Sequence, residues 1–210
     1  MQQHTLFDTH QDECLISGLS YQVAFLSVQE ERELLLILGT LDLEAVQYKE
    51  FLSRRRVVSF GGRYDYQMQQ LLPTAALDER LEPLRVRVAK WMGIPCDELV
   101  QTLVAEYTAG TALGWHRDVP QFERIVGVSL GSTANLRFRP YPYRPEMKSH
   151  VVRLEVAPRS IYRIEGDARW AWHTVLSQRR HCDGPLPFAP RPSSEEITSN
   201  ISRHYEDRNS

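Results

Sequence analysis

Two histidines and one aspartate have the types and the order of a metal-ligand set. His116 and Asp118 stand two residues apart, and His173 follows far downstream. In a β-strand the side chains at positions i and i+2 lie on one face, so His116 and Asp118 can point together at one metal ion. Two imidazoles and one carboxylate form the facial triad that holds non-haem Fe(II) with open coordination positions. The spacing therefore predicts an iron site that His173 completes from another strand.

The residues around this pair decide whether it is more than a chance occurrence. Seven histidines in 210 residues make an isolated His-x-Asp common. Here, however, Tyr107 ends a strand-like apolar run nine residues before His116. An alternating run at Ile125–Leu130 and a second strand-like stretch at Asn135–Arg139 follow the pair. This ordered context favours the metal site.

From roughly Arg54 to Thr174 these features resemble the AlkB-like family of Fe(II)- and 2-oxoglutarate-dependent dioxygenases. The resemblance implies Fe(II), 2-oxoglutarate and O₂ as cofactors. It implies His116, Asp118 and His173 as metal ligands and catalytic residues, and Tyr107 as a hydrogen-bond partner of 2-oxoglutarate. The expected reaction hydroxylates an N-methyl group on an alkylated nucleobase of DNA or RNA, and the product then loses formaldehyde.

The C-terminal tail departs from the family pattern. AlkB-like proteins place two arginines on a strand soon after the second histidine, and both bind 2-oxoglutarate, because a guanidinium matches a carboxylate in bidentate geometry. This sequence has no such pair at that distance. Aligning Asn200–Ser202 with the middle of the motif puts Arg203 one place early, and a one-residue slip on a strand turns a side chain to the opposite face. We take Arg203 as the candidate. The alternatives are that Arg179, Arg180 or Arg191 substitutes for it, or that this tail does not bind 2-oxoglutarate in the family manner.

Aromatic and basic residues near the motif are the candidates for contacting a substrate. A flipped base needs aromatic surfaces on which to stack, and phosphates need arginines. The alternatives are core packing for the aromatic residues and ordinary solvent exposure for the arginines. The run Arg54–Arg56 is read equally as a phosphate contact or as a solvated helix end. The candidate substrate residues are Tyr64, Tyr66, Trp115, Arg137 and Arg139.

Local signals predict helices in the first half of the chain. Ser27 followed by Glu30 fits a capping box, and Gly39 is placed to end that helix in the left-handed conformation. A second helix is expected over Leu43–Leu52. A stripe of apolar residues at steps of three and four predicts an amphipathic helix that begins near Pro83, because proline is tolerated in the first turn.

Short alternating runs replace the helical spacing from about residue 100. Seven short strands separated by turns indicate two antiparallel sheets, and a jelly roll of this kind also follows from the resemblance. The predicted fold is α+β, a double-stranded β-helix with N-terminal helices packed on one side. The expected strands are Val100–Tyr107, Leu113–His116, Ile125–Leu130, Ala134–Phe138, Val151–Val156, Ser160–Ile164 and Ala171–Thr174.

Length and composition predict one domain. At 210 residues the chain can bury one sizeable core. We expect a poorly ordered lead-in at 1–20, an AlkB-like domain at 21–178 and an irregular tail at 179–210. Within the domain, a substrate lid is expected at about 54–70 and the jelly-roll core at about 100–175.

Charge and cysteine content limit the partners. The net charge of −2 excludes a globally basic nucleic-acid coat but allows a local basic surface. Three separated cysteines without a Cys-x-x-Cys pair are typical of free thiols in a reducing compartment. We expect a cytoplasmic monomer that acts on alkylated DNA or RNA and has no membrane partner. The alternatives are the same chemistry on a protein or small molecule, and a non-catalytic AlkB-like binding domain.

Overall fold

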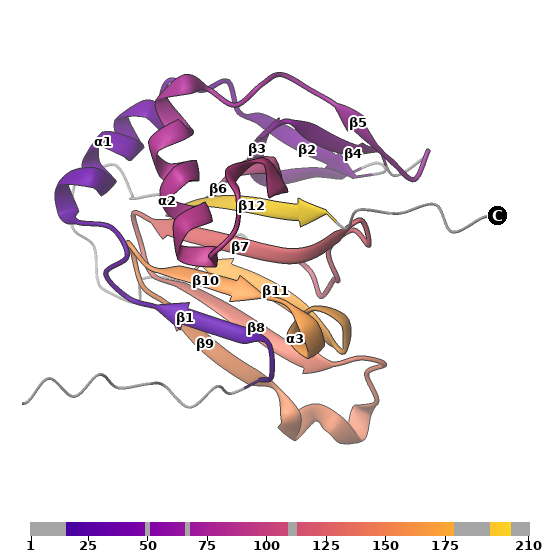
Figure 1. Ribbon diagram of the computed structural model, residues 1–210. Helices are drawn as coiled ribbons and strands as arrows, with labels where there is room; N and C mark the ends of the chain where they lie inside the picture. The colour runs from indigo at the N-terminus through magenta and orange to yellow at the C-terminus, as the bar shows by residue number, and fades with distance from the viewer. Residues whose placement is uncertain (1–15, 49–50, 66–67, 109–112, 179–193, 203–210) are drawn as a thin grey trace, which may run out of the picture.

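Two antiparallel β-sheets face each other and carry helices on one outer side (Figure 1). The computed structural model describes residues 16–48, 51–65, 68–108, 113–178 and 194–202. The seven-stranded sheet has the order β1-β10-β7-β12-β6-β3-β2, and the three-stranded sheet has the order β11-β8-β9. The first contains β1 (Leu19–Gln22), β2 (Glu44–Tyr48), β3 (Phe51–Phe60), β6 (Leu99–Tyr107), β7 (Phe122–Leu130), β10 (Ile161–Ile164) and β12 (Ser194–Ser202). The second contains β8 (Ala134–Pro140), β9 (Val152–Val156) and β11 (Trp172–Gln178).

Two hydrophobic clusters lie on the two faces of the seven-stranded sheet. The cluster between the sheets includes Ala105, Tyr107, Leu136 and Phe138, and we call this side the inner face of each sheet. The second cluster joins the outer face of the large sheet to α1 (Val28–Leu38) and α2 (Glu82–Met92). The predicted α+β jelly roll, with its N-terminal helices on one side, is confirmed.

The two helices begin where the sequence predicted. The side chain of Ser27 accepts a hydrogen bond from the Glu30 amide at 3.2 Å, and Glu30 Oε2 accepts one from the Ser27 amide at 2.7 Å. Pro83 stands in the first turn of α2. Gly39 caps α1 but has a right-handed φ of −63°, so the predicted left-handed end is wrong. The chain instead continues into turns in which Thr40 and Leu41 donate to carbonyls three residues back.

The helix expected over Leu43–Leu52 is wrong, because β2 and β3 form an antiparallel pair there. Strand β3 also pairs with β6, which sets Val57 opposite Ala105. Pairing with an existing strand outweighs a weak local helical tendency. The expected lid at about 54–70 therefore begins as part of the large sheet and continues into the separate hairpin of β4 (Gly62–Asp65) and β5 (Gln70–Pro73).

The tail also differs from the expected irregular segment. Strand β12 lies between β6 and β7 and pairs with both. Its Ile197 is only 3% exposed and packs toward the helices. Strands β6 and β7 run in the same direction, so a strand of opposite direction between them satisfies the backbone hydrogen bonds of both. Within the expected lead-in, Leu19 already belongs to β1.

Most other predicted strands match the structure within a few residues. The exception is Leu113–His116, where the described residues form an isolated bridge between His116 and Thr174. The remaining described helical segments are short: η1 (Glu79–Leu81), η2 (Cys96–Glu98), η3 (Pro145–His150) and α3 (Gly166–Trp170). No helix among the described residues is long and apolar enough to cross a membrane.

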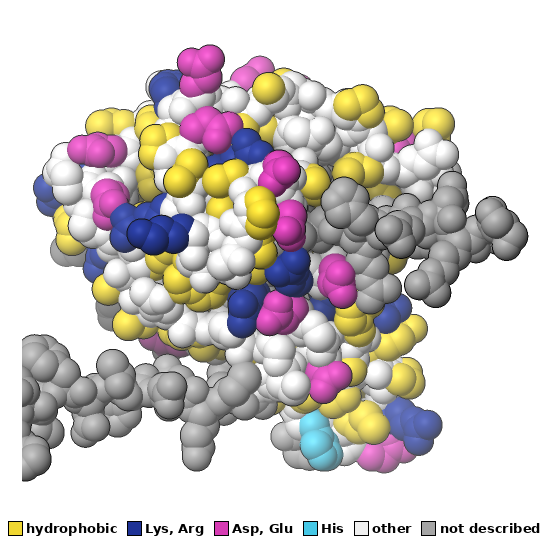
Figure 2. Space-filling view, in the orientation of Figure 1, with side chains coloured by type: hydrophobic (Ala, Val, Ile, Leu, Met, Phe, Trp, Pro, Cys, Tyr) yellow, Lys and Arg dark blue, Asp and Glu magenta, His cyan; other side chains and the backbone are white. Residues whose placement is uncertain are grey.

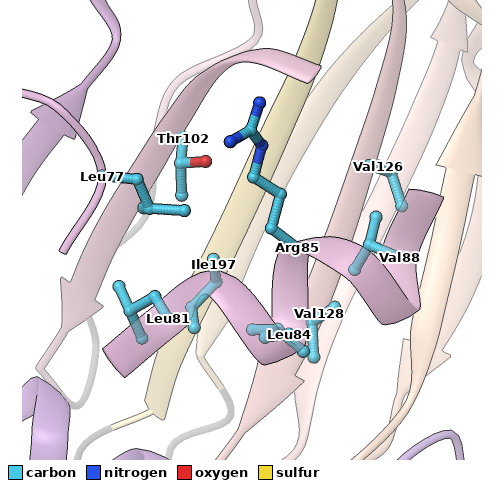
Figure 3. A pocket seen from close by; sticks show the side chains of 9 residues that line it. All are labelled: Leu77, Leu81, Leu84, Arg85, Val88, Thr102, Val126, Val128 and Ile197. Carbon is cyan, nitrogen blue, oxygen red and sulfur yellow. The ribbon is translucent and has the colours of Figure 1, made fainter. Parts of the chain in front are cut away.

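A small cavity lies between α2 and the outer face of the large sheet (Figure 3). Leu84 of α2 faces Val128, Val88 faces Val126, and Arg85 extends its guanidinium beside Thr102. This cavity is separated from the space between the sheets by the large sheet itself. The helical side of the molecule shows basic and acidic side chains interspersed (Figure 2), so this view shows no large field of one sign.

Candidate active site

His116 and Asp118 lie close together beside the small sheet. His116 Nε2 is 3.6 Å from Asp118 Oδ1, and His116 Nδ1 is 2.7 Å from the Gly114 carbonyl oxygen. The His116 amide donates to the Thr174 carbonyl at 3.0 Å, and the Thr174 amide donates back at 2.8 Å. This bridge fixes His116 next to β11, and bridged residues share a face. Thr174 is buried on the side that faces Phe138, so His116 points to the inner face.

Arg169, a residue of α3, holds the loop that carries Asp118. Its Nη2 donates to the carbonyls of Asp118 at 3.0 Å and Val119 at 2.7 Å, and its Nε donates to the Phe122 carbonyl at 3.0 Å. Arg169 is 2% exposed. Removing a buried guanidinium that donates to three carbonyls destabilises the protein, because each buried carbonyl is left without a hydrogen-bond partner. The position of Asp118 is therefore built into the fold.

The pair is electrostatically coupled. Burial alone would lower the pKa of His116, but the hydrogen bond and charge of Asp118 and the Gly114 carbonyl raise it above its ordinary value. Burial would raise the pKa of Asp118, yet His116, Arg169 and Arg55 together lower it. Asp118 is thus held as a carboxylate beside an imidazole, and these are two of the three donor types that the motif predicted.

His173 lies on the opposite face of β11. It pairs with Arg139, and Thr174 pairs with the buried Phe138, so the two residues alternate in direction. Arg139 Nε lies 3.4 Å from His173 Nδ1, and the rings of His173 and Tyr141 are 4.7 Å apart in an edge contact. No three His, Cys, Asp or Glu side chains within the described ranges are gathered closely enough to hold a metal. The structure brings His116 and Asp118 together and places His173, the third predicted ligand, on the opposite face of the sheet.

Arginines and aromatic rings alternate around His173. The guanidiniums of Arg137 and Arg139 lie 5.4 and 4.6 Å from the centre of the Trp115 ring. Arg139 is also 4.5 Å from Tyr143, and Arg117 is 3.9 Å from Tyr141. We call this group the basic-aromatic face; it consists of Trp115, Arg117, Arg137, Arg139, Tyr141, Tyr143 and His173. Burial and the charges of Arg139, Arg117 and His116 lower the pKa of His173.

Tyr107, the predicted hydrogen-bond partner of 2-oxoglutarate, lies on the inner face. It is 5% exposed and belongs to the cluster between the sheets. Arg55 pairs with it across β3 and β6, and Arg55 Nη1 lies 3.4 Å from the Tyr107 hydroxyl oxygen. The charge of Arg55 also lowers the pKa of both His116 and Asp118. Tyr107 and Arg55 therefore belong to the surroundings of the His116–Asp118 pair.

The other predicted residues are dispersed. Arg56 pairs with Glu106 on the outer face of the large sheet, so Arg54–Arg56 is neither a helix end nor a cluster on one face. Tyr64 lies in β4, and Gln121 donates to the Gln69 carbonyl at 3.4 Å, which connects that hairpin to the loop after Asp118. Tyr66 and Arg203 lie outside the described residues, as do the alternatives Arg179, Arg180 and Arg191.

Sequence reasoning missed three residues of this region: Arg55 as an inner-face residue, Arg117 and Arg169. Arg169 carried no usable signal, because a buried arginine in a short connecting helix looks like any charged residue. Arg55 did have a usable signal. If Arg54–Arg56 forms a strand, alternate side chains point to opposite faces, so Arg55 lies on the face opposite to that of its two neighbours.

The fold and the inner His116–Asp118 pair define a jelly-roll protein of the oxygenase type. A family model described as the 2OG-Fe(II) oxygenase superfamily matches residues 39–204. The chain belongs to this superfamily, a class of oxidoreductases that use Fe(II), 2-oxoglutarate and O₂. The predicted resemblance is confirmed at this level.

Individual relatives are more distant. Uncharacterized protein L905 of Acanthamoeba polyphaga mimivirus is 32% identical over 100 residues, which is 47% of this chain and 46% of that protein. The chain therefore spans about half the length of this relative. The structure of OsALKBH1 is similar with a TM-score of 0.64 and 14% identity, over 88% of this chain and 96% of that one. A 2OG-Fe(II) oxygenase family oxidoreductase from Burkholderia pseudomallei has a TM-score of 0.53 and 15% identity, over 89% and 86%. These two likenesses show the fold.

Proposed function

We propose that this protein is a dioxygenase that oxidatively demethylates alkylated bases in DNA or RNA. The observation that carries the proposal is the position of the basic-aromatic face directly beside the His116–Asp118 pair. Trp115 and Arg117 belong to this face and flank His116 in the chain. A nucleic-acid strand that contacts this face would lie against the segment Trp115–Arg117, whose middle residue, His116, points to the inner site.

The donor chemistry suits the iron of this class. Fe(II) held by two imidazoles and a carboxylate, with 2-oxoglutarate and O₂, supplies the oxidation of a C–H bond. In the proposed site His116 and Asp118 provide two donors from the inner face, and His173 is the third. His173 is the second residue of β11, and a one-residue shift at this strand start would exchange the faces of Trp172 and His173.

The charges of the basic-aromatic face support a polyanionic substrate. Within the described part of the chain, Arg117, Arg137 and Arg139 lie over aromatic rings, and none forms an ion pair with a carboxylate. Arg137 also stands directly opposite Arg153 on β9, and like charges in this arrangement are destabilising. A bound phosphate would relieve this repulsion, and an aromatic ring gives a base a stacking surface.

Salt-dependent binding tests the proposal. Each phosphate contact contributes about 0.7 to 0.9 to the slope of log affinity against log salt. Replacing Arg137 and Arg139 with Ala should therefore reduce the slope for an N-methylated single-stranded oligonucleotide by roughly 1.4, because a single strand contributes about 0.7 per contact. Arg32→Ala with Lys90→Ala, exposed positions on α1 and α2, removes the same charge elsewhere and should leave the slope nearly unchanged.

Two results would redirect the assignment. Equal slopes in both double variants would show that the basic-aromatic face does not contact phosphate. Turnover of 2-oxoglutarate without any affinity for oligonucleotides would favour a protein or small-molecule substrate. The demethylation itself is measured as formaldehyde released per succinate formed.

A further inference from the structure

The strand register gives Arg55 a place that its neighbours do not share. On β6 the inner residues are Ala105 and Tyr107, and Arg55 stands opposite Tyr107 on β3. Arg56 stands opposite Glu106 on the outer face, where the two side chains form an ion pair. Two adjacent arginines thus occupy different environments, and only Arg55 faces the space between the sheets.

The surroundings of Arg55 are suited to a small anion. Its Nη1 is 3.4 Å from the Tyr107 hydroxyl oxygen, and its guanidinium carbon is 5.9 Å from the centre of that ring. His116 points to the same space between the sheets, so a ligand held by Arg55 lies on the side that carries the His116–Asp118 pair. A guanidinium and a phenol hydroxyl side by side can both donate to one carboxylate.

Strand β12 does not supply a competing guanidinium beside Tyr107. Its nine residues, Ser194–Ser202, contain no arginine. Tyr107 pairs with Ser194 at the start of β12, whereas the other end of β12 pairs with Leu99 and Phe122. Arg203 follows that other end in the sequence. The described arginine next to Tyr107 therefore comes from β3.

We propose that Arg55 binds the carboxylate of 2-oxoglutarate remote from its keto group, with Tyr107 donating to the same carboxylate. The inference rests on the proposed function, because it assumes that the keto end of 2-oxoglutarate reaches a metal at His116 and Asp118. It moves cosubstrate recognition from the tail strand to β3. The site then selects 2-oxo acids that carry a second, distal carboxylate.

Binding of two 2-oxo acids tests this role without turnover. Calorimetry is done with the full chain loaded with Mn(II), using 2-oxoglutarate and also 2-oxobutyrate, which lacks the distal carboxylate. Loss of a hydrogen-bonded charge predicts that Arg55→Gln raises the Kd for 2-oxoglutarate about 10- to 100-fold, with that for 2-oxobutyrate unchanged. Arg56→Gln is the matched control and should alter neither. Arg55→Lys keeps the charge without the planar fork and should fall between the wild type and Arg55→Gln.

A double-mutant cycle adds a second readout. Tyr107→Phe alone should weaken 2-oxoglutarate binding about fivefold, and in the Arg55→Gln background its effect should change, because both side chains hold one carboxylate. Thermal unfolding midpoints of Arg55→Gln and Arg55→Lys are compared with that of Arg56→Gln to show that the variants are folded. If Arg55→Gln is unfolded, the affinity of Arg55→Lys is used in its place.

Three outcomes are decisive. Unchanged 2-oxoglutarate affinity in Arg55→Gln and Arg55→Lys would overturn the inference while leaving the proposed function intact. A loss of affinity in Arg203→Gln with none in Arg55→Gln would do the same and return recognition to the tail. Failure of the wild-type protein to bind either acid in the presence of Mn(II) would overturn both the inference and the proposed function.

Discussion

The two faces of the three-stranded sheet carry residues of different character. On the inner side, His116 and Asp118 form a coupled pair whose backbone is fixed by Arg169 and by the bridge to Thr174. On the outer side, His173 contacts the Tyr141 ring edge-on and lies beside Arg139. The inner side raises a histidine pKa and the outer side lowers one. The two faces of β11 therefore carry a metal-donor environment and a basic-aromatic one, and His173 belongs to the second.

The largest expected effect is loss of turnover on the inner side. His116→Ala or Asp118→Ala should reduce 2-oxoglutarate consumption to the level without added Fe(II), because either change removes a metal donor. Succinate formation is the measurement. His150→Ala, an exposed histidine on η3, is the control and should retain wild-type activity. Undiminished activity in either inner variant would remove that residue from the metal site.

The next effect is on stability. Arg169→Met leaves three carbonyls without their donor and should lower the free energy of unfolding by about 3 kcal/mol. Arg117→Met removes an exposed arginine whose contact with the Trp170 carbonyl is long, at 3.4 Å, and should cost less than about 1 kcal/mol. Urea unfolding of the metal-free protein measures both. Equal losses would mean that Arg169 does not fix the Asp118 loop.

The smallest effect concerns ionisation and compares the faces directly. In metal-free protein, the His116 imidazole should titrate above 6.5 because Asp118 favours its protonated form. The His173 imidazole should titrate below 6.5 because burial and neighbouring arginines disfavour that form. NMR titration of the ring protons, assigned with single His→Gln variants, gives both values. The reverse order would contradict the described division between the faces.

The sequence predicted the jelly roll because β-strands show an alternation of apolar and polar residues. It predicted the His116–Asp118 pair because residues at i and i+2 share a strand face. It failed where a long-range partner decides the structure. Residues 44–48 form a strand because β3 pairs with them, and β12 lies in the sheet because β6 and β7 need a strand between them. Nothing local encodes either pairing.

The candidate site shows the same limit. The residue types and their order in the sequence predicted His173 as a ligand. The face on which its ring lies, however, depends on the register of β11 with β8, which sets His173 opposite Arg139. The run Arg54–Arg56 shows the same dependence. The pairing of β3 with β6 sets Arg55 on the inner face and lets Arg56 form an ion pair with Glu106 on the outer face. Spacing predicts which residues can meet, and register decides which of them do.

His116 and Asp118 are expected to hold the iron to which 2-oxoglutarate binds. Anaerobic titration of the protein with Fe(II) and then 2-oxoglutarate shows this binding through the visible charge-transfer band of the chelate. We expect a band in the wild type that is absent in His116→Ala and weakened in His173→Ala. A band of full strength in His116→Ala would mean that His116 does not hold the iron, and no band in a wild-type protein that has bound iron would mean that 2-oxoglutarate does not bind to it.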